Sequence, residues 1–330
     1  MRTLILLLAL AGCSSKDTAK DGSTSSGGDG GEDLAVSPAG DLASGPILPR
    51  FDLGGTMLDL ANLVTSDGGL VEARPYHFYV PPGYDKNTPT PLVIMLHGYS
   101  ATAAEQELYW NLTPTAKSKT FLNAYPDGTV DPSGNRFWNA TDACCDLYNL
   151  PVDDVAYVNA IIDDVQAKYN VDEKRIYVTG HSNGGFMSHR MACDAPRVAA
   201  IVSLAGAQWQ QPTKCKPAGP VSVLEIHGDA DAVINYNGGN ILGHQYPSAM
   251  QTVEDWAVDN GCSSSLTDTG MTLDLESVLA GAETKVSAYD GCKPGGAVEL
   301  WTIQGGSHVP SLQPIWGDTL YGFLMAHPKP

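Results

Sequence analysis

The pattern of apolar and polar residues predicts a series of strands and helices from about residue 70 onward. Short runs of β-branched and other apolar residues predict strands at 76–80, 92–96, 121–125, 176–179, 200–204, 221–226 and 298–303. Helix-like segments lie between them at 152–169, 184–194, 246–260 and 311–327. This alternation is typical of a mostly parallel central sheet with helices on both faces. In such sheets, functional residues follow the carboxyl ends of strands.

A separate apolar run lies at the very start of the chain. Residues 1–3 form a short basic start, residues 4–10 are apolar, and residues 10–13 are Leu-Ala-Gly-Cys. This pattern is typical of an export signal. It resembles a bacterial lipoprotein signal, in which cleavage precedes Cys13 and acyl chains on that cysteine anchor the mature chain in a membrane. The alternative is an ordinary secretory cleavage site. The run is too short for a spanning helix, which needs about 20 residues.

Composition changes sharply after the signal. Residues 14–49 are rich in Gly, Ser and Pro, contain no aromatic residue and have six acidic residues against two lysines. Such a segment cannot bury enough apolar surface to offset the entropy of ordering, so we expect a flexible linker. The predicted organisation is therefore a signal peptide at 1–12, a lipidated cysteine and linker at 13–49, and one catalytic α/β domain at 50–330.

Charge narrows the range of partners. The chain has 37 acidic and 19 basic residues, which give a formal net charge of -18. Because a field of this sign repels phosphate backbones, we expect no nucleic-acid partner. It also favours a substrate that is uncharged near the reacting bond.

The segment after strand 176–179 carries the strongest chemical signal. Gly180-His181-Ser182-Asn183-Gly184 is a Gly-x-Ser-x-Gly sequence that opens into a helix. Ser182 would occupy a tight strand-to-helix turn, in which side chains at Gly180 and Gly184 would collide. The turn would place the hydroxyl at the positive end of the helix, where an oxyanion is stabilised. We therefore predict that Ser182 is a nucleophile, the alternative being an ordinary helix N-cap.

A serine nucleophile needs a base, and the base needs a third group that fixes its tautomer. In α/β-hydrolases the order along the chain is serine, acid, histidine, each after a later strand. Strand 298–303 is followed by His308, which we prefer as the base to His244 and His327. Strand 221–226 is followed by Asp229 and Asp231. We prefer Asp231, because Asp229 falls in the turn itself.

An oxyanion hole completes such a site. One donor should be the backbone N–H of Asn183, the residue after the nucleophile. The second should come from the loop after strand 92–96, where we choose the N–H of Tyr99, with Gly98 or Ser100 as alternatives. We expect His97 to hold this loop and not to act as a base.

Four motifs together resemble one known family. They are Leu96-His97-Gly98, Gly180-His181-Ser182-Asn183-Gly184-Gly185, His227-Gly228-x-x-Asp231 and Gly305-Gly306-Ser307-His308-x-Pro310. They are similar to the secreted polyhydroxybutyrate depolymerases, close kin of bacterial feruloyl and acetylxylan esterases. The resemblance implies an α/β-hydrolase fold and ester hydrolysis through an acyl-enzyme. It implies Ser182, Asp231 and His308 as the triad, with no cofactor and no metal.

Substrate and assembly are less constrained by the sequence. Tyr99, Trp138 and Trp209 are candidates for an aromatic wall that binds the acyl group. We expect a monomer that acts on a polyester of the polyhydroxybutyrate type, with feruloyl or acetylxylan esters of the plant cell wall, or aromatic polyesters, as alternatives. A surface binding protein without turnover is the alternative from another class. One departure from many relatives, a missing third glycine before His308 and a missing tryptophan after it, leaves the shape of the acyl pocket open.

Six cysteines remain if Cys13 is acylated. Cys262 and Cys292 flank one segment, and we expect them to form a disulfide. Cys193 and Cys215 would then bind Cys144 and Cys145 in one order or the other, because a bond between adjacent cysteines is disfavoured. An exported chain without metal-binding motifs makes metal ligation by these cysteines the weaker interpretation.

Overall fold

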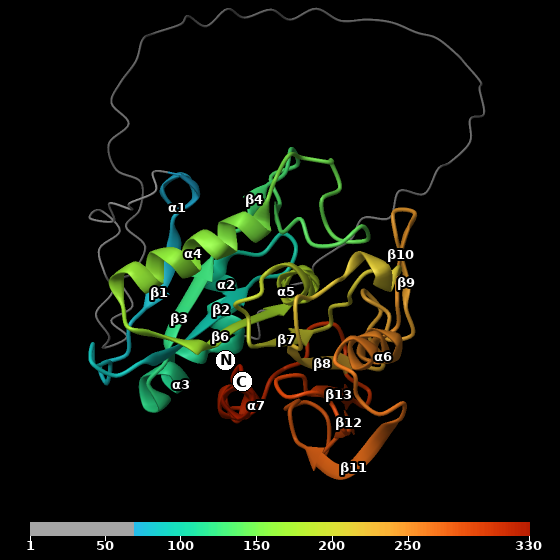
Figure 1. Ribbon diagram of the computed structural model, residues 1–330. Helices are drawn as coiled ribbons and strands as arrows, with labels where there is room; N and C mark the ends of the chain where they lie inside the picture. Colours follow the sequence, from blue (N-terminus) through green and yellow to red (C-terminus); the bar gives the residue numbers. More distant parts are fainter. Residues whose placement is uncertain (1–68) are drawn as a thin grey trace, which may run out of the picture. The chain divides into compact units, whose positions relative to one another are not determined.

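The computed structural model (Figure 1) describes residues 69–330, so the predicted signal peptide, the predicted acylation site Cys13 and the linker lie outside the described residues. The strands are β1 (Tyr76–Tyr79), β2 (Thr90–Leu96), β3 (Leu122–Pro126), β4 (Thr129–Val130), β5 (Arg136–Phe137), β6 (Val171–His181), β7 (Ala200–Leu204), β8 (Ser222–Gly228), β9 (Gly239–Ile241), β10 (His244–Tyr246), β11 (Leu266–Leu273), β12 (Thr284–Tyr289) and β13 (Val298–Ile303). The helices are α1 (Leu70–Ala73), α2 (Ala103–Trp110), α3 (Leu112–Lys119), α4 (Asp154–Lys168), α5 (Asn183–Asp194), α6 (Ala249–Asp259) and α7 (Trp316–Ala326).

Nine strands form one sheet in the order β1-β3-β2-β6-β7-β8-β13-β12-β11. The six strands from β3 to β13 in this order run parallel, and the strands at the two edges are antiparallel to their neighbours. The carboxyl ends of β6, β8 and β13 therefore lie at one edge of the sheet, so the loops that follow them can meet. The pairs β4–β5 and β9–β10 form small separate hairpins.

Side-chain alternation along the strands builds a core on each face of the sheet. In β2, Leu92, Ile94 and Leu96 belong to one buried cluster, whereas Val93 and Met95 belong to the other. This is the period of two that a strand imposes. Helices α4, α5 and α6 contribute to the first cluster, and α2, α3 and α7 to the second. Within residues 69–330, none of the helices is long and apolar enough to cross a bilayer.

All seven predicted strands and all four predicted helices are present; β7 and β13 have the predicted bounds, and the ends of the others are shifted. Elements that the apolar pattern did not indicate include α2, α3, β11 and β12. Helix α2 begins with a capping box between Thr102 and Glu105, a local signal independent of hydrophobicity. Strand β11 lies at the sheet edge and is largely exposed, so it lacks the apolar runs from which strands were predicted.

Strand β11 also carries an irregularity. Its register with β12 shifts between Asp268 and Thr272, and Gly270 within this stretch has φ 74°. The outermost strand of the sheet is therefore bulged.

Candidate active site

Ser182 lies in the sharp turn between β6 and α5. Its backbone angles, φ 54° and ψ -118°, are unusual for a residue with a side chain. A Cβ atom at Gly180 would overlap the carbonyl group of Gly184, and one at Gly184 would overlap the carbonyl oxygen of Leu96. Both glycines are therefore required by close backbone approach, as the sequence predicted.

The structure brings Ser182, His308 and Asp231 together from the loops after β6, β13 and β8. Ser182 Oγ lies 2.9 Å from His308 Nε2, and His308 Nδ1 lies 2.7 Å from Asp231 Oδ2. Burial opposes ionisation of Asp231, but hydrogen bonds from neighbouring histidines and the Val233 backbone lower the pKa of its carboxyl group well below the usual range. Because an ionised carboxylate only accepts hydrogen bonds, His308 Nδ1 carries the proton and Nε2 is free to accept the Ser182 hydroxyl.

The alternative residues occupy other positions. The Gly305 N–H donates to Asp229 Oδ1 at 2.6 Å, so Asp229 ties the turn after β8 to the loop that carries His308. His244 is exposed in β10. His327 caps the end of α7 by donating from Nδ1 to the Phe323 carbonyl oxygen at 2.7 Å.

The two residues predicted to donate to an oxyanion lie on segments next to Ser182. Asn183 is the first residue of α5, and Tyr99 is in the loop after β2. A Cβ atom on the neighbouring Gly98 would lie 3.5 Å from Ser182 Cβ, so this loop passes directly beside the serine. Within residues 69–330, neither the Tyr99 nor the Asn183 N–H donates a hydrogen bond. Both groups are therefore free to bind an anionic oxygen.

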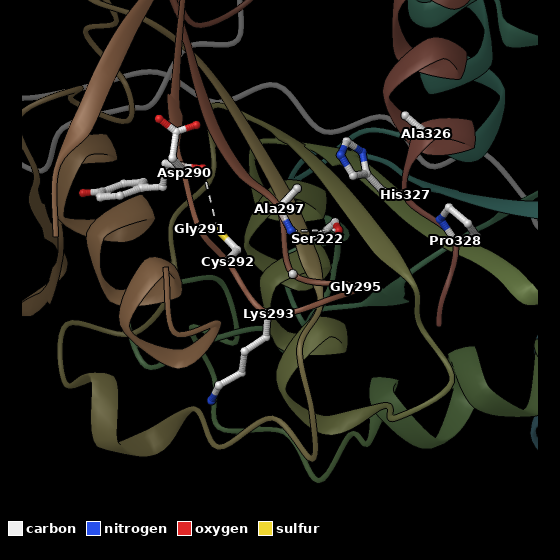
Figure 2. A pocket seen from close by; sticks show the side chains of 12 residues that line it. Ser222, Asp290, Gly291, Cys292, Lys293, Gly295, Ala297, Ala326, His327 and Pro328 are labelled. Carbon is white, nitrogen blue, oxygen red and sulfur yellow. Dashed lines mark hydrogen bonds between the residues drawn. The ribbon is translucent and has the colours of Figure 1, made fainter. Parts of the chain in front are cut away.

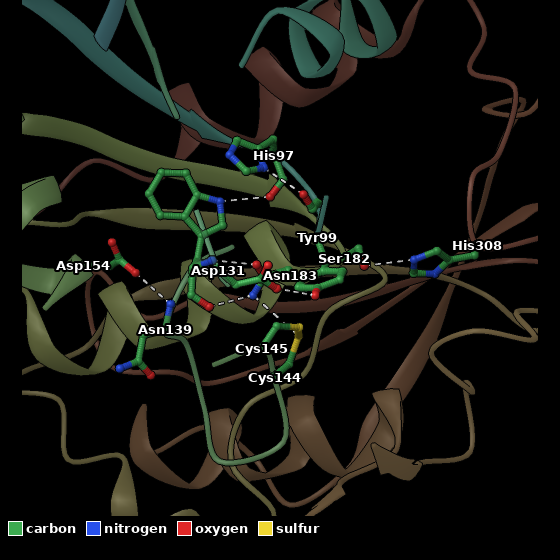
Figure 3. Close-up of a disulfide and its surroundings, with 12 residues drawn as sticks. His97, Tyr99, Asp131, Asn139, Cys144, Cys145, Asp154, Ser182, Asn183 and His308 are labelled. Atoms are coloured by element: carbon green, nitrogen blue, oxygen red, sulfur yellow. Dashed lines mark hydrogen bonds between the residues drawn. A yellow bond between two sulfur atoms is a disulfide. The ribbon is translucent and has the colours of Figure 1, made fainter. Parts of the chain in front are cut away.

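His97 and Trp138 fix the loop that carries Tyr99 (Figure 3). The Gly128 N–H donates to His97 Nε2 at 2.8 Å, so His97 Nδ1 carries the proton and donates to the Gly98 carbonyl oxygen at 2.7 Å. Burial lowers the pKa of His97 to about 4, which keeps the ring neutral. Trp138 Nε1 donates to the His97 carbonyl oxygen at 3.0 Å. His97 thus holds the loop.

The known proteins that this chain resembles include esterases. Residues 74–211 match the family model described as "Esterase PHB depolymerase". Feruloyl esterase B from Piromyces equi is 30% identical over 237 residues, which cover 69% of this chain and 41% of that protein. Feruloyl esterase D from Neurospora crassa is 26% identical over 253 residues, which cover 73% of this chain and 75% of that protein. The chain is therefore similar to polyhydroxybutyrate depolymerases and feruloyl esterases.

A solved structure supports the fold assignment of this chain. The acetyl xylan esterase from Aspergillus awamori superimposes with a TM-score of 0.54 at 15% sequence identity, covering 77% of this chain and 95% of that one. Together with the parallel sheet and its helical layers, this similarity identifies an α/β-hydrolase fold. The match to Feruloyl esterase B spans less than half of that relative's own length.

Two of the three aromatic residues that we predicted to bind substrate lie in the core. Trp138 is fully buried and Trp209 is 6% exposed, so neither forms the expected open wall. The Trp138 ring instead supports the His97 loop, and the Arg190 guanidinium lies 5.4 Å from the centre of the Trp209 ring. Tyr99 is partly exposed, and its hydroxyl donates to Asp131 Oδ2 at 2.7 Å. Trp138 is therefore a buried residue that holds a loop and not part of an open substrate wall.

Three disulfides join Cys144 to Cys145, Cys193 to Cys215 and Cys262 to Cys292. The third pair confirms the prediction, whereas the expected bonds from Cys144 and Cys145 to Cys193 and Cys215 are wrong. Cys144 Sγ lies 3.5 Å from Asn183 Nδ2 at the start of α5, but Cys193 is ten residues further along that helix. At 1.5 Å per residue this is about 15 Å, beyond the reach of a disulfide.

Three residues with roles around Ser182 were missed. His181 Nε2 lies 2.8 Å from the His308 carbonyl oxygen and holds the backbone of that loop. Burial, followed by the neighbouring His308, lowers the pKa of His181 to about 3, so the ring is neutral and donates this bond. His189 and Glu225 form a buried pair, and Glu225 contacts His227, which in turn contacts Asp231. A glutamate within an otherwise apolar buried strand was the available signal for the last of these.

Two cavities lie at opposite ends of the strands of the sheet. One of about 320 Å³ includes Ser222, the first residue of β8, with Cys292 and His327 (Figure 2). It is therefore at the amino end of β8, away from Asp231. The other, of about 550 Å³, is formed by the loops after β7 and β8 and by the β9–β10 hairpin, on the side of the sheet where Ser182 lies. Its lining is dominated by side-chain amides, namely Gln210, Asn237, Asn240, Gln245 and Gln251.

Proposed function

We propose that this protein is a carboxylic-ester hydrolase in which Ser182 is the nucleophile, His308 the general base and Asp231 the residue that orients the base. The observation that carries the proposal is the continuous hydrogen-bonded series from Ser182 Oγ through both His308 nitrogens to Asp231 Oδ2. This geometry and these tautomers are what a weakly acidic hydroxyl needs to become a nucleophile.

The reaction follows from these contacts in two halves. His308 Nε2 takes the Ser182 proton as Oγ attacks the ester carbonyl carbon, and the resulting oxyanion accepts hydrogen bonds from the Asn183 and Tyr99 N–H groups. The C–O bond to the alcohol then breaks, and His308 returns its proton to the departing oxygen. Water repeats the sequence on the acyl-enzyme, which releases the acid and free Ser182. Loss of one oxyanion donor in such a site costs about 10² to 10³ in turnover.

For the substrate, we propose an ester carried by a sugar, of the feruloyl or acetyl type. Two observations support it: the relatives named feruloyl esterases, and the amide-lined cavity on the loops after β7 and β8. Side-chain amides both donate and accept hydrogen bonds, which matches the hydroxyl groups of a sugar. A hydroxybutyrate polyester is the second candidate, favoured by the description of the matching family model.

We further propose an extracytoplasmic location with a lipid anchor at Cys13 and a linker up to residue 49. Three disulfides within residues 69–330 support an oxidising compartment. Replacement Cys13→Ser should release the full-length protein from membranes into the soluble fraction. Continued sedimentation with membranes would contradict the anchor.

The function is tested by initial rates on methyl ferulate, acetylated xylan and hydroxybutyrate oligomers, with Ser182→Ala as the control. The wild-type protein should hydrolyse at least one ester, and Ser182→Ala should lose that activity while keeping the circular dichroism and melting temperature of a folded protein. Activity retained by Ser182→Ala would overturn the nucleophile. A folded wild-type protein that is inactive on all three esters would favour a binding protein.

A further inference from the structure

A second group of ionisable side chains lies directly behind the proposed triad. Glu225 and His227 are two residues apart in β8, so both point to the same face of the sheet. That face is covered by α5 and α6, and the exposed fractions of the two side chains are 0% and 1%. The mechanism proposed above makes no use of either residue, although burial of ionisable groups is costly unless they are paired.

His189 of α5 lies between Glu225 and Trp256 of α6, and these two partners determine which of its ring nitrogens carries the proton. Trp256 Nε1 lies 3.0 Å from His189 Nδ1, and an indole N–H can only donate. His189 Nδ1 is therefore unprotonated, and the proton lies on Nε2. His189 Nε2 is 3.0 Å from Glu225 Oε2, so the neutral ring donates to the carboxylate.

His227 is held between oxygen atoms on both sides. Its Nδ1 lies 3.0 Å from Glu225 Oε1, and its Nε2 lies 2.8 Å from the Ile234 carbonyl oxygen and 3.5 Å from Asp231 Oδ2. When the two carboxylates are ionised, every one of these oxygens accepts, so both ring nitrogens carry protons. Burial disfavours this charge, but hydrogen bonds with Asp231 and Glu225 outweigh it and raise the pKa of His227 to about 9.

Glu225 is suited to balance this cation. Burial would raise the pKa of its carboxyl group, but hydrogen bonds from His189 and His227 lower it below the usual value. One negative and one positive charge therefore lie side by side in the core, with a neutral His189 behind them. His227 is the member of this pair that faces the triad.

Asp231 contacts the pair through the same oxygen that His308 uses. Its Oδ1 accepts from the N–H groups of Val233 and Ile234, at 2.7 and 2.9 Å. Its Oδ2 accepts from His308 and also faces His227 Nε2. We propose that His227, held as a cation by Glu225, is a positioning residue that fixes Asp231 and disfavours a second positive charge on His308. This inference rests on the proposed function of Ser182, His308 and Asp231.

Such a cation has a consequence for how activity depends on pH. Ester hydrolysis needs neutral His308, so activity rises with pH along an acidic limb, and a neighbouring cation shifts that limb to lower pH. Removing the cation should move it to higher pH. The titratable groups around His227 and His308 are Glu225, Asp229, Asp231, His181, His189 and Tyr236.

The main test uses a charge-balanced double variant, Glu225→Gln with His227→Gln. The single variant His227→Gln would leave a buried carboxylate without its cation and can fail to fold, whereas the double variant keeps amide hydrogen bonds and zero net charge. His327→Gln, a histidine at the end of α7, is the matched control. We measure kcat and KM from pH 4 to 9 on the best ester.

In the double variant the midpoint of the acidic limb should rise by about half a pH unit, less than the roughly one unit expected for a lone neighbouring charge, because the more distant negative charge of Glu225 is removed together with the cation. At neutral pH, kcat should fall about tenfold with little change in KM, because Asp231 is less well fixed. His327→Gln should match the wild type. A limb within about 0.2 units of the wild type in a folded double variant would overturn the positioning role.

A second measurement does not depend on a variant that folds. Long-range 1H–15N spectra of the wild-type protein labelled at histidine should show one ring with both nitrogens protonated from pH 6 to 8, assigned to His227. A neutral His227 at pH 7 would overturn the inference. Failure of the proposed function is a separate outcome, because it would appear as a wild-type protein without Ser182-dependent esterase activity.

Discussion

Replacing Asp231 by asparagine should have a large effect, because the surrounding bonds determine how the new amide is oriented. The carboxylate Oδ1 accepts from two backbone N–H groups, so the asparagine oxygen must occupy that position. The NH₂ group then faces His308 Nδ1, where Oδ2 stood at 2.7 Å. A donor there opposes the N–H of His308 and favours the tautomer with the proton on Nε2. That tautomer cannot accept the Ser182 proton.

The expected loss in kcat is about 10⁴, the size known for the wrong histidine tautomer in such a triad, which is about 5 kcal/mol of activation free energy. Asp229→Asn is the matched control. Its asparagine oxygen can still accept the Gly305 N–H that Asp229 binds at 2.6 Å, so kcat should change by less than about threefold. Initial rates on one nitrophenyl ester at pH 7.5 measure both variants. A loss below tenfold in Asp231→Asn, or an equal loss in Asp229→Asn, would refute this assignment of the acid.

Three further predictions concern stability. The folded pKa of His227, about 9, lies above the unfolded value of about 6.5. Protonated His227 therefore contributes fully to the free energy of unfolding below pH 6.5, and this contribution, up to about 3 kcal/mol, is lost as pH rises through 9. Urea unfolding at pH 6 and 9.5 should show this loss. The Glu225→Gln, His227→Gln double variant should not show it. Gly184→Ala, whose Cβ would overlap a β2 carbonyl, should fail to fold or lose all activity. Gly98→Ala should remain folded, because its new Cβ would lie 3.4 Å from the nearest atom. Equal melting temperatures of the two variants would contradict this prediction. Serine at both Cys193 and Cys215 opens a disulfide across 22 residues and should cost about 3 kcal/mol in urea unfolding; a loss below 1 kcal/mol would count against it.

The parts of the site that could be predicted from the sequence are those encoded by local patterns. The turn at Ser182 needs glycines at fixed spacing, and Asp231 and His308 follow apolar strands that the chain order places in one sheet. The distances between the side chains of Ser182, His308 and Asp231 could not be predicted from the sequence. The order of the elements was nevertheless enough to choose Asp231 over Asp229, and His308 over His244 and His327.

The parts that could not be predicted depend on contacts between distant segments. Trp138 was expected to bind substrate, because nothing local indicates that its ring N–H donates to the His97 carbonyl oxygen. The Cys144–Cys145 bond was disfavoured, since the sequence does not show that α5 separates these residues from Cys193. Glu225 could have been recognised from the sequence, because a charged residue in a buried strand needs a partner. That this partner is His189 could not be predicted, because it depends on how α5 packs against the sheet.

The bulge in β11 has a consequence for how the protein behaves at high concentration. An edge strand exposes unpaired N–H and C=O groups, on which a strand of another molecule can align and begin aggregation. β11 is the longer of the two edges, since β1 has only four residues. The register shift between Asp268 and Thr272, with Gly270 in a left-handed conformation, breaks the regular row of these groups. The irregular edge thus offers an incoming strand no continuous row of groups to pair with. Electrostatic repulsion between molecules of net charge -18 further opposes their association.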